Sequence, residues 1–476
     1  MSRARLLFSD TLVLAFGTLG GRIIGILLLP LYTHALSRAE FGTVDLVSTG
    51  VDLVLPLIYL AISEAVLRFA MSRSEDMGTV VKSALAFVSS MSGLLTVALP
   101  VATIWLPWRE VVTVGTLIGV QSLCLVLGAW ARAAGHVKLF AASGLTQAIA
   151  AGSSNVLVLL VAKLGVLGFL LSLLIGQLAA LAVLVSGLPL RETLRGVQVD
   201  RSVLRRMLLF SAPLVPNVVL WWITNLSGRF VLATVHGVEQ VGLFAAASRF
   251  PAVLTMITTV FAQAWQLAAN RTVETDDARA RGRFFSRALR TYLNLLLLAL
   301  SLLLVFLHPL VTVLVGPDFR PAWRLVPPLL IGATGAAVSA FLGAIYTAHH
   351  RSSLVFRTTV VAGVLAFVLN LVLVPPLGAM GAACSIALSF AALSAIRFLD
   401  VRRLTPIGVS GWQVASSLLL IGSQVGLLYS GLDGTLRSVL LAVIFVGVAV
   451  VNRHSLIDLL RVGRGSLTGN AATDRE

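Results

Sequence analysis

The stretch "NLVLVPPLGAMGAA", residues 370–383, indicates how the chain is built, because an earlier stretch has the same pattern. Residues 155–169 read "NVLVLLVAKLGVLGF". Both copies are apolar, begin with asparagine and continue through two glycines three residues apart, Gly378 and Gly381 in the second copy. Small residues at a helix start allow close packing against a neighbour. We interpret each copy as the outer end of one helix, a short turn and the start of the next helix.

The composition is that of a membrane protein. Of 476 residues, 58% are hydrophobic and 12% charged, and the mean hydropathy is +0.96. A soluble domain with this balance would have too little polar surface. The net charge is +16, but the basic residues fall between apolar runs, so we expect anionic phospholipids rather than nucleic acid as their partners.

The sequence shows no recognisable catalytic motif. We find no metal-ligand spacing, no phosphate-binding glycine loop and no nucleophile with a base. The two cysteines, Cys124 and Cys384, lie inside apolar runs and show no pairing pattern. We therefore predict a protein that is not an enzyme and has no cofactor and no bound metal.

Apolar runs long enough to cross a bilayer, roughly 20 residues, recur along the chain. They predict an all-α polytopic membrane protein with about 14 transmembrane helices, in two parallel six-helix lobes plus two C-terminal helices. The predicted spans are 12–36, 43–67, 79–105, 111–131, 141–162, 164–187, 207–233, 241–267, 288–315, 323–347, 354–374, 377–396, 411–431 and 435–452.

The lobes follow from the repeat. The two copies are separated by six predicted spans, an even number, so both copies face the same way. A second echo pairs "SRAEFGTVDL" around Gly42 with "GVEQVGLFAA" around Gly242. The predicted domains are an N-terminal lobe (1–187), a basic cytoplasmic linker (188–206), a C-terminal lobe (207–400), and two further helices with a cytoplasmic tail (401–476).

Orientation follows from the basic residues. Most of the 36 lysines and arginines fall in loops on the same side as the N-terminus. Cytoplasmic loops collect such residues, so both termini are predicted to be cytoplasmic.

Charges within spans are the candidate site residues, because each costs roughly 2.5 to 3.5 kcal/mol at a helix centre. Arg22, Asp52 and Arg249 are predicted near the bilayer midplane, and Asp45 lies two turns before Asp52 on the same helix face. In one interpretation Arg22 and Asp52 form a structural pair and Arg249 bonds backbone carbonyls. In the other, the arginines line a wet cavity between the lobes and bind phosphate, while Asp52 and Asp45 carry a coupling cation or proton.

The seventh span adds further candidates. Arg229 could extend to lipid headgroups or gate the cavity mouth. Asn217 and Trp221 could bind sugars, although a packed helix with amide cross-links explains them better. Pro213 and Pro216 predict a bend.

Two segments carry a family resemblance. "LSRAEFGTVDLVSTGVDLVLPLIYLAISEAVLRF" and "PLVPNVVLWWITNLSGRFVLATVHGVEQVGLFAAASRF" resemble the polysaccharide biosynthesis or O-antigen (Wzx-type) flippases, members of the multidrug/oligosaccharidyl-lipid/polysaccharide exporter superfamily. The resemblance covers nearly the whole chain. It implies alternating access and cavity arginines on the first and eighth helices, which Arg22 and Arg249 match. Members of the family often have Asp-Arg where this chain has Gly228-Arg229, which argues against an ion pair there.

The sequence and the resemblance together predict a flippase that moves polyprenyl-pyrophosphate-linked oligosaccharide across the bacterial inner membrane for O-antigen or exopolysaccharide synthesis. The predicted partners are this lipid, a coupling H+ or Na+ and other polysaccharide assembly proteins. Two alternatives remain open: a cation-coupled multidrug exporter of the same superfamily, and a membrane saccharide polymerase.

Overall fold

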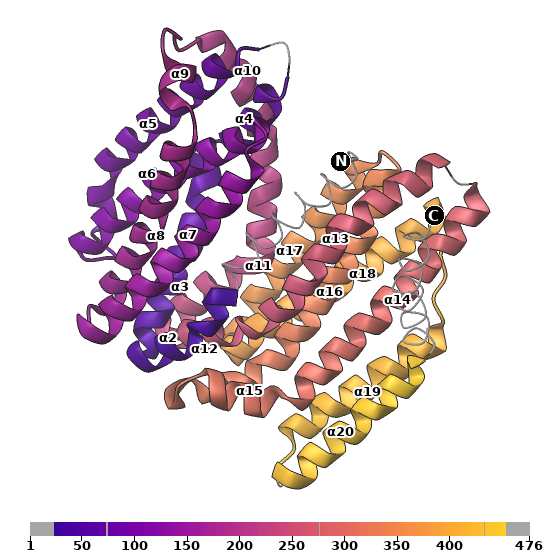
Figure 1. The fold of residues 1–476 in the computed structure, drawn as a ribbon. Coiled ribbons are helices and arrows are strands. Elements are labelled where there is room, and N and C mark those ends of the chain that lie inside the picture. The colour runs from indigo at the N-terminus through magenta and orange to yellow at the C-terminus, as the bar shows by residue number, and fades with distance from the viewer. Residues whose placement is uncertain (1–22, 73–74, 276, 433, 454–476) are drawn as a thin grey trace, which may run out of the picture. The chain divides into compact units, whose positions relative to one another are not determined.

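The computed structural model describes residues 23–72, 75–275, 277–432 and 434–453, and it is built from helices (Figure 1). Within these residues, twelve helical segments are long and apolar enough to cross a membrane. The predicted all-helical polytopic fold is therefore confirmed. The first predicted span begins outside the described residues, and a turn at Ser248 and Arg249 divides the eighth.

The helices up to the predicted linker largely follow the apolar runs, although the second predicted span is divided at residues 59–61 into two helices. They are α2 (Leu29–Ala35), α3 (Arg38–Ile58), α4 (Ile62–Ala70), α5 (Met77–Ala102), α6 (Trp108–Ala133), α7 (Val137–Val156), a π-helical turn η1 (Leu157–Val161) and α8 (Gly165–Gly187).

The remaining helices continue to the end of the described chain. They are α9 (Leu190–Leu194), α10 (Arg201–Ser211), η2 (Ala212–Leu214), α11 (Val215–His236), α12 (Val238–Ala247), α13 (Phe250–Thr275), α14 (Ala278–Val305), α15 (Leu307–Leu314), η3 (Pro317–Leu325), α16 (Val326–Ala348), α17 (Ser352–Leu377), α18 (Ala379–Leu404), α19 (Gly411–Tyr429) and α20 (Gly434–Val451).

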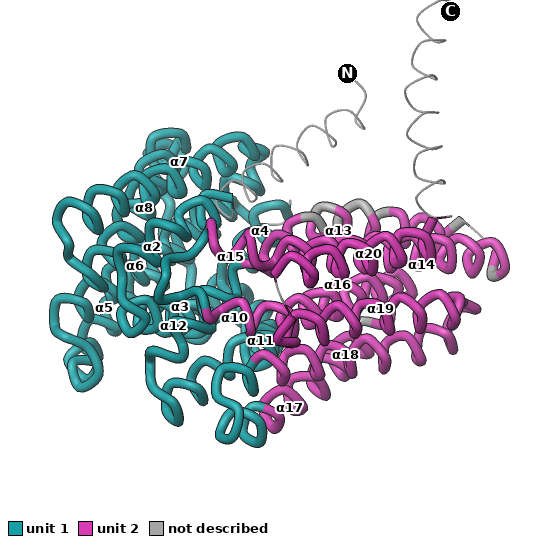
Figure 2. The backbone as a smooth tube through the Cα atoms, turned by 90° about the horizontal axis from the view of Figure 1, so that it is seen from below, with its two compact units in different colours: residues 1–249, 314–320, 370–382 teal, residues 250–313, 321–369, 383–476 magenta. Residues whose placement is uncertain are grey.

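The chain divides into two compact units (Figure 2). Unit 1 comprises residues 1–249, 314–320 and 370–382, and unit 2 comprises the rest. Helices α11 and α12, which the sequence assigns to the C-terminal lobe, belong to unit 1. Compactness and repeat symmetry are different criteria, so the lobe boundaries stay a prediction.

The two copies of the repeated stretch share local structure. The first glycine of each copy lies in the left-handed region, with φ +54° at Gly165 and +58° at Gly378, where a Cβ would be strained. The leading asparagines are both buried. Asn155 donates to the Tyr32 hydroxyl, and Asn370 donates to the Ser227 hydroxyl, each at 3.3 Å. Each asparagine thus links the fifth helix of its predicted lobe to an earlier helix.

The second echo of the sequence forms a contact within unit 1. Gly42 of α3 and Gly242 of α12 lie against each other's helix backbone: a Cβ on Gly42 would lie 2.0 Å from the Val238 carbonyl oxygen, and one on Gly242 would lie 2.0 Å from that of Arg38. Only hydrogen fits at both positions. The two echo segments therefore cross at their matching glycines.

Two distant segments complete unit 1 near this crossing. The backbone N–H of Gly316 donates to the Thr33 hydroxyl at 2.9 Å, and Arg38 Nε donates to the Asp318 carbonyl oxygen at 2.6 Å. His236, the last residue of α11, contacts the Val374 carbonyl oxygen through Nε2 at 2.9 Å. These hydrogen bonds to backbone groups hold the two distant segments against the rest of unit 1.

The seventh span is irregular where the sequence predicts a bend, and the bend itself stays a prediction. At Pro213 the chain forms the short 3₁₀ segment η2 between α10 and α11, because a proline supplies no N–H for the helical ladder.

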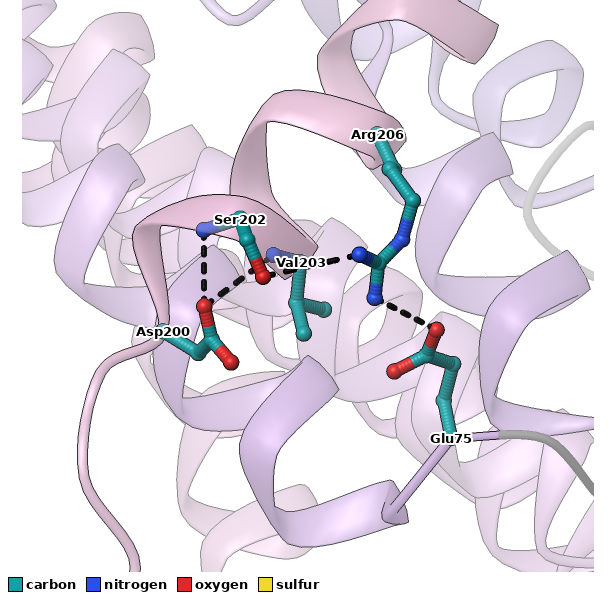
Figure 3. A network of polar contacts seen from close by, with 5 residues as sticks. All are labelled: Glu75, Asp200, Ser202, Val203 and Arg206. Carbon is teal, nitrogen blue, oxygen red and sulfur yellow. Dashed lines mark hydrogen bonds and ion pairs between the residues drawn. The ribbon is translucent and has the colours of Figure 1, made fainter.

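The predicted linker docks on α5. Arg206 donates to Glu75, just before α5, at 2.6 Å (Figure 3). The N–H of Asp200 donates to the buried Ser83 hydroxyl of α5 at 3.1 Å. Lys82 Nζ donates to the carbonyl oxygens of Leu194 and Val197. The linker residues are therefore held by side chains of unit 1.

Unit 2 has an aromatic core. Trp265 of α13 stacks on Phe341 of α16 with ring centroids 4.0 Å apart, and its Nε1 donates to the Phe341 carbonyl oxygen at 3.0 Å. The rings of Phe261 and Tyr292 stack at 4.4 Å beside them. These stacked rings join α13, α14 and α16.

Candidate functional site

Unit 1 contains a cavity of about 670 Å³. Its walls are the chain before α2, with Ile24 and Leu28, and one face each of α3, α6, α7 and α8. Arg249, in the turn between α12 and α13, completes the lining. The cavity between the lobes that the sequence predicts stays a prediction. Among the described residues, this cavity is walled by helices of the predicted N-terminal lobe, and Arg249 is its one lining residue from beyond the linker.

The cavity exists because α7 presents small residues to it. Ala141, Gly144, Ala148, Ala151 and Gly152 recur at helical spacing and leave volume unfilled. On the neighbouring helix a Cβ at Gly176 would lie 2.8 Å from the Ala151 Cβ, so α7 and α8 pack closely behind this wall.

The cavity lining includes polar and charged side chains from several helices. Its polar and charged side chains are Tyr32, Ser48, Asp52, Gln121, Cys124, Arg132, Ser143, Gln147, Asn155, Gln177 and Arg249. Two arginines against one carboxylate give the lining a net positive charge.

Arg249 lies in this lining, near Tyr32, with which it interacts electrostatically. Its guanidinium forms no ion pair and no hydrogen bond with any described residue. No described backbone carbonyl accepts a hydrogen bond from this guanidinium, and the interpretation in which Arg249 bonds backbone carbonyls stays untested. An unpaired guanidinium in a cavity has donors available for an anion.

Asp52 also lines the cavity, and its side chain is exposed to it. It forms no ion pair within the described part of the chain. Arg22, the predicted partner of Asp52, lies outside the described residues. The predicted Arg22–Asp52 pair therefore stays a prediction.

Asp45 has the opposite environment from Asp52. It is buried, and its Oδ2 accepts a hydrogen bond from Arg229 Nε at 2.5 Å, which ties α3 to α11. The guanidinium also lies over the Phe244 ring of α12, 5.3 Å from its centroid. Both side chains are about one-tenth exposed.

This pair corrects the prediction for Arg229. The missing acid at Gly228 argued against an ion pair, but Asp45 supplies the acid from another helix. Arg229 neither extends to headgroups nor lines the cavity. Gly228 has a different role: a Cβ there would lie 2.8 Å from Asn370 Oδ1, so the glycine makes room for the repeated asparagine.

Asn217 and Trp221 lie on the exposed side of α11, outside the cavity lining. The adjacent Trp222 instead donates through Nε1 to the Thr49 carbonyl oxygen of α3 at 3.0 Å. The structure therefore does not bring the predicted sugar-binding pair to the arginine site.

Two arginines that the sequence assigns to loops are parts of the folded helices. Arg132, near the end of α6, lines the cavity. Arg397 of α18 is buried in unit 2, where it donates to the Ser339 carbonyl oxygen at 2.8 Å and to the Thr358 and Thr359 hydroxyls at 3.1 Å. Both lie just beyond an apolar run, on helices that continue past it.

One known family accounts for much of the chain, including most of the cavity-lining residues. The model of the polysaccharide biosynthesis protein family matches residues 34–324. The chain belongs to this family. The predicted resemblance is thus confirmed, while no curated protein sequence matches the chain.

Solved structures share the fold at low sequence identity. A lipid II flippase MurJ in an inward closed conformation has a TM-score of 0.69 at 13% identity, covering 94% of this chain and 99% of that one. An inward-facing multidrug resistance MATE transporter of the MOP superfamily has a TM-score of 0.68 at 14% identity, covering 81% and 94%. An outward-facing MATE transporter has a TM-score of 0.61 at 14% identity, covering 83% and 95%.

These comparisons show the fold of membrane transporters and flippases. The chain is a multi-pass membrane protein with this fold, and the solved structures that share the fold are named as a flippase and as transporters.

Proposed function

We propose that this protein moves a polyprenyl-pyrophosphate-linked oligosaccharide across the bacterial inner membrane by alternating access, for synthesis of a surface polysaccharide. The family is named for polysaccharide biosynthesis, and a flippase of another lipid-linked saccharide precursor, lipid II, shares the fold. The observation that carries the proposal is the unpaired guanidinium of Arg249 in a net basic cavity.

The chemistry of this cavity suits such a head group. A guanidinium binds two phosphate oxygens at once, and the glutamine side chains of Gln121, Gln147 and Gln177 offer donors and acceptors to sugar hydroxyls. The volume of about 670 Å³ lies within the range of small-molecule sites, roughly 300–1,000 Å³. The polyprenyl chain would stay in lipid, where it needs no protein cavity.

Asp52 is our candidate for coupling to H+ or Na+. Its carboxylate lines the cavity and forms no hydrogen bond or ion pair with a described residue, whereas Asp45 is already paired with Arg229. A cation bound at Asp52 would neutralise the one negative charge of the lining and favour binding of an anionic head group.

The experiment compares Arg249→Gln and Arg249→Lys with Arg191→Gln, a matched control at an exposed arginine of α9. Each variant replaces the native protein in its host, and surface polysaccharide, protein level and lipid-linked precursor on the inner leaflet are measured. Loss of the charge-assisted hydrogen bonds predicts a fall in surface polysaccharide of about tenfold or more for Arg249→Gln, with precursor accumulating. Arg249→Lys retains part of the function, and Arg191→Gln is unchanged. Normal polysaccharide in Arg249→Gln would refute the site.

One observation favours a second candidate, a cation-coupled drug exporter. The carboxylate of Asp52 could bind a cationic compound directly, and multidrug transporters share the fold. Efflux of ethidium that Asp52→Asn abolishes and Arg249→Gln leaves unchanged would select this function over the flippase.

A further inference from the structure

Arg132 has the surroundings of an anion-binding residue rather than of a loop arginine. It lines the cavity at the end of α6, and it forms no ion pair within the described ranges. Its Nε donates weakly to the Gly128 carbonyl oxygen at 3.4 Å. The other four N–H donors of the guanidinium have no described partner.

The position of this guanidinium is fixed by an aromatic ring. Arg132 lies over Phe140 of α7, 4.9 Å from the ring centroid, and Phe140 also lines the cavity. Gly128 makes room for that ring, because a Cβ there would lie 3.0 Å from Phe140 Cε2. Cation–π contact orients an arginine without using its hydrogen-bond donors.

Arg132 and Arg249 act on parts of the lining that lie far apart along α7. Phe140, under Arg132, and Asn155, hydrogen-bonded to Tyr32 beside Arg249, lie fifteen residues apart on α7. At 1.5 Å per residue this is about 22 Å. A pyrophosphate is much shorter than this separation along α7, which favours two binding positions over one.

We propose that Arg132, braced by Phe140 and Gly128, forms a separate site for the pyrophosphate group of the lipid carrier at the predicted cytoplasmic end of the cavity. This Arg132 site holds the head group before it reaches Arg249. The inference rests on the proposed flippase function and assigns a first step within it. A phospholipid phosphate has related chemistry but lower charge, so the test includes both sources.

The native cysteines provide the assay. Cys124 lines the cavity on α6, eight residues and about 12 Å from Arg132, and Cys384 is the one other cysteine in the chain. In a Cys384→Ala background, the protein is placed in phosphatidylcholine nanodiscs. The rate of Cys124 modification is measured with an anionic and with a cationic methanethiosulfonate reagent, without lipid additions, with phosphatidylglycerol and with undecaprenyl pyrophosphate.

We expect undecaprenyl pyrophosphate to protect Cys124 and phosphatidylglycerol to protect it much less. Arg132→Gln should weaken protection by undecaprenyl pyrophosphate about tenfold and lower the ratio of anionic to cationic modification rates, while Arg132→Lys keeps the ratio. Phe140→Leu should weaken protection with the ratio nearly unchanged, because the charge remains. The control Arg191→Gln should change neither quantity.

Each remaining outcome decides the question. Equal protection by phosphatidylglycerol, or unchanged protection in Arg132→Gln, overturns the assignment. Transport at the native rate in Arg132→Gln, with loss in Arg249→Gln, rejects the Arg132 site and leaves the flippase intact. Protection that depends on Arg132 in a protein that moves no glycolipid keeps the site and rejects the flippase.

Discussion

Helix α3 carries two carboxylates two turns apart on one face, and the structure gives them opposite environments. Asp45 is buried and bonded to Arg229, beside the glycine crossing of α3 and α12. Asp52 lines the cavity and forms no hydrogen bond or ion pair with a described residue. We call the packed surroundings of Gly42, Gly242, Asp45 and Arg229 the closed region, and the cavity around Asp52 the open region. Helix α3 runs through both.

The two environments determine whether a charge affects mainly stability or mainly ligand binding. A buried pair neutralises both of its members, and breaking it leaves an uncompensated charge, so its first effect is on stability. An unpaired charge in a cavity contributes little to stability and is available to a ligand. Stability and transport measurements should therefore separate the two regions.

The largest effect is expected at the glycine crossing. Gly42→Val would place a Cβ only 2.0 Å from the Val238 carbonyl oxygen, so the two helix backbones must separate. We expect a loss of unfolding free energy of more than about 4 kcal/mol, or failure to accumulate in the membrane. Expression and thermal unfolding in detergent measure this.

Gly50, on the same helix, is the matched control. A Cβ there meets nothing within 4 Å. Gly50→Val should leave accumulation near native. If both variants behave alike, the crossing is not a close contact.

The second largest effect is expected at the ion pair. Asp45→Asn leaves the buried Arg229 guanidinium without its ion-pair partner, which costs about 3 kcal/mol of unfolding free energy. Asp52→Asn, in contrast, should change stability by less than about 0.5 kcal/mol and change transport instead. Thermal unfolding of both single variants, with a transport assay, checks this.

The double variant Asp45→Asn with Arg229→Gln provides the control for the ion pair, because it removes both charges. It should be more stable than Asp45→Asn alone. If the double variant is no more stable than Asp45→Asn, the charges of the pair do not contribute to stability. The closed and the open region would then not differ in the way stated above.

The sequence predicts the helices and the two carboxylates, but not their partners. Runs of about 20 apolar residues are a local property, and the shared face of Asp45 and Asp52 follows from helix geometry. That Arg229 faces Asp45 depends on how α3 and α11 pack, over 184 residues of separation. No local sequence pattern determines which residues of these two helices face each other.

The sequence pattern assigns two arginines to the wrong structural element for the same reason. The apolar runs end at residues 131 and 396, so the pattern places Arg132 and Arg397 in loops, but α6 continues to Ala133 and α18 to Leu404. A long side chain near a helix end can turn back into the protein when an aromatic ring or hydroxyls receive it, as Phe140 and Thr358 do here. The sequence signal is therefore an arginine within one turn of an apolar run.

A third carboxylate extends the comparison to a charge that is neither buried nor in the cavity. Asp200 precedes α10 and caps it: Oδ1 accepts from the backbone N–H groups of Ser202 at 2.7 Å and Val203 at 3.3 Å (Figure 3). The side chain of Ser202 and then these N–H groups hold the pKa of the Asp200 carboxyl below its ordinary value. The charged form is therefore favoured in the folded state.

The sign of the pH effect follows from this lowered pKa. Above the unfolded pKa, about 3.9, the capping interaction contributes its full stabilisation, which is lost as the pH falls through the lower folded pKa. Asp200→Asn keeps a capping oxygen without the titration. The difference in unfolding temperature between native protein and Asp200→Asn should be constant from pH 7 to about 5 and shrink below about 4. Because the carboxylate is fully exposed, this is the smallest of the effects considered, and a difference that grows on acidification would show that another group, not the Asp200 cap, carries the pH dependence.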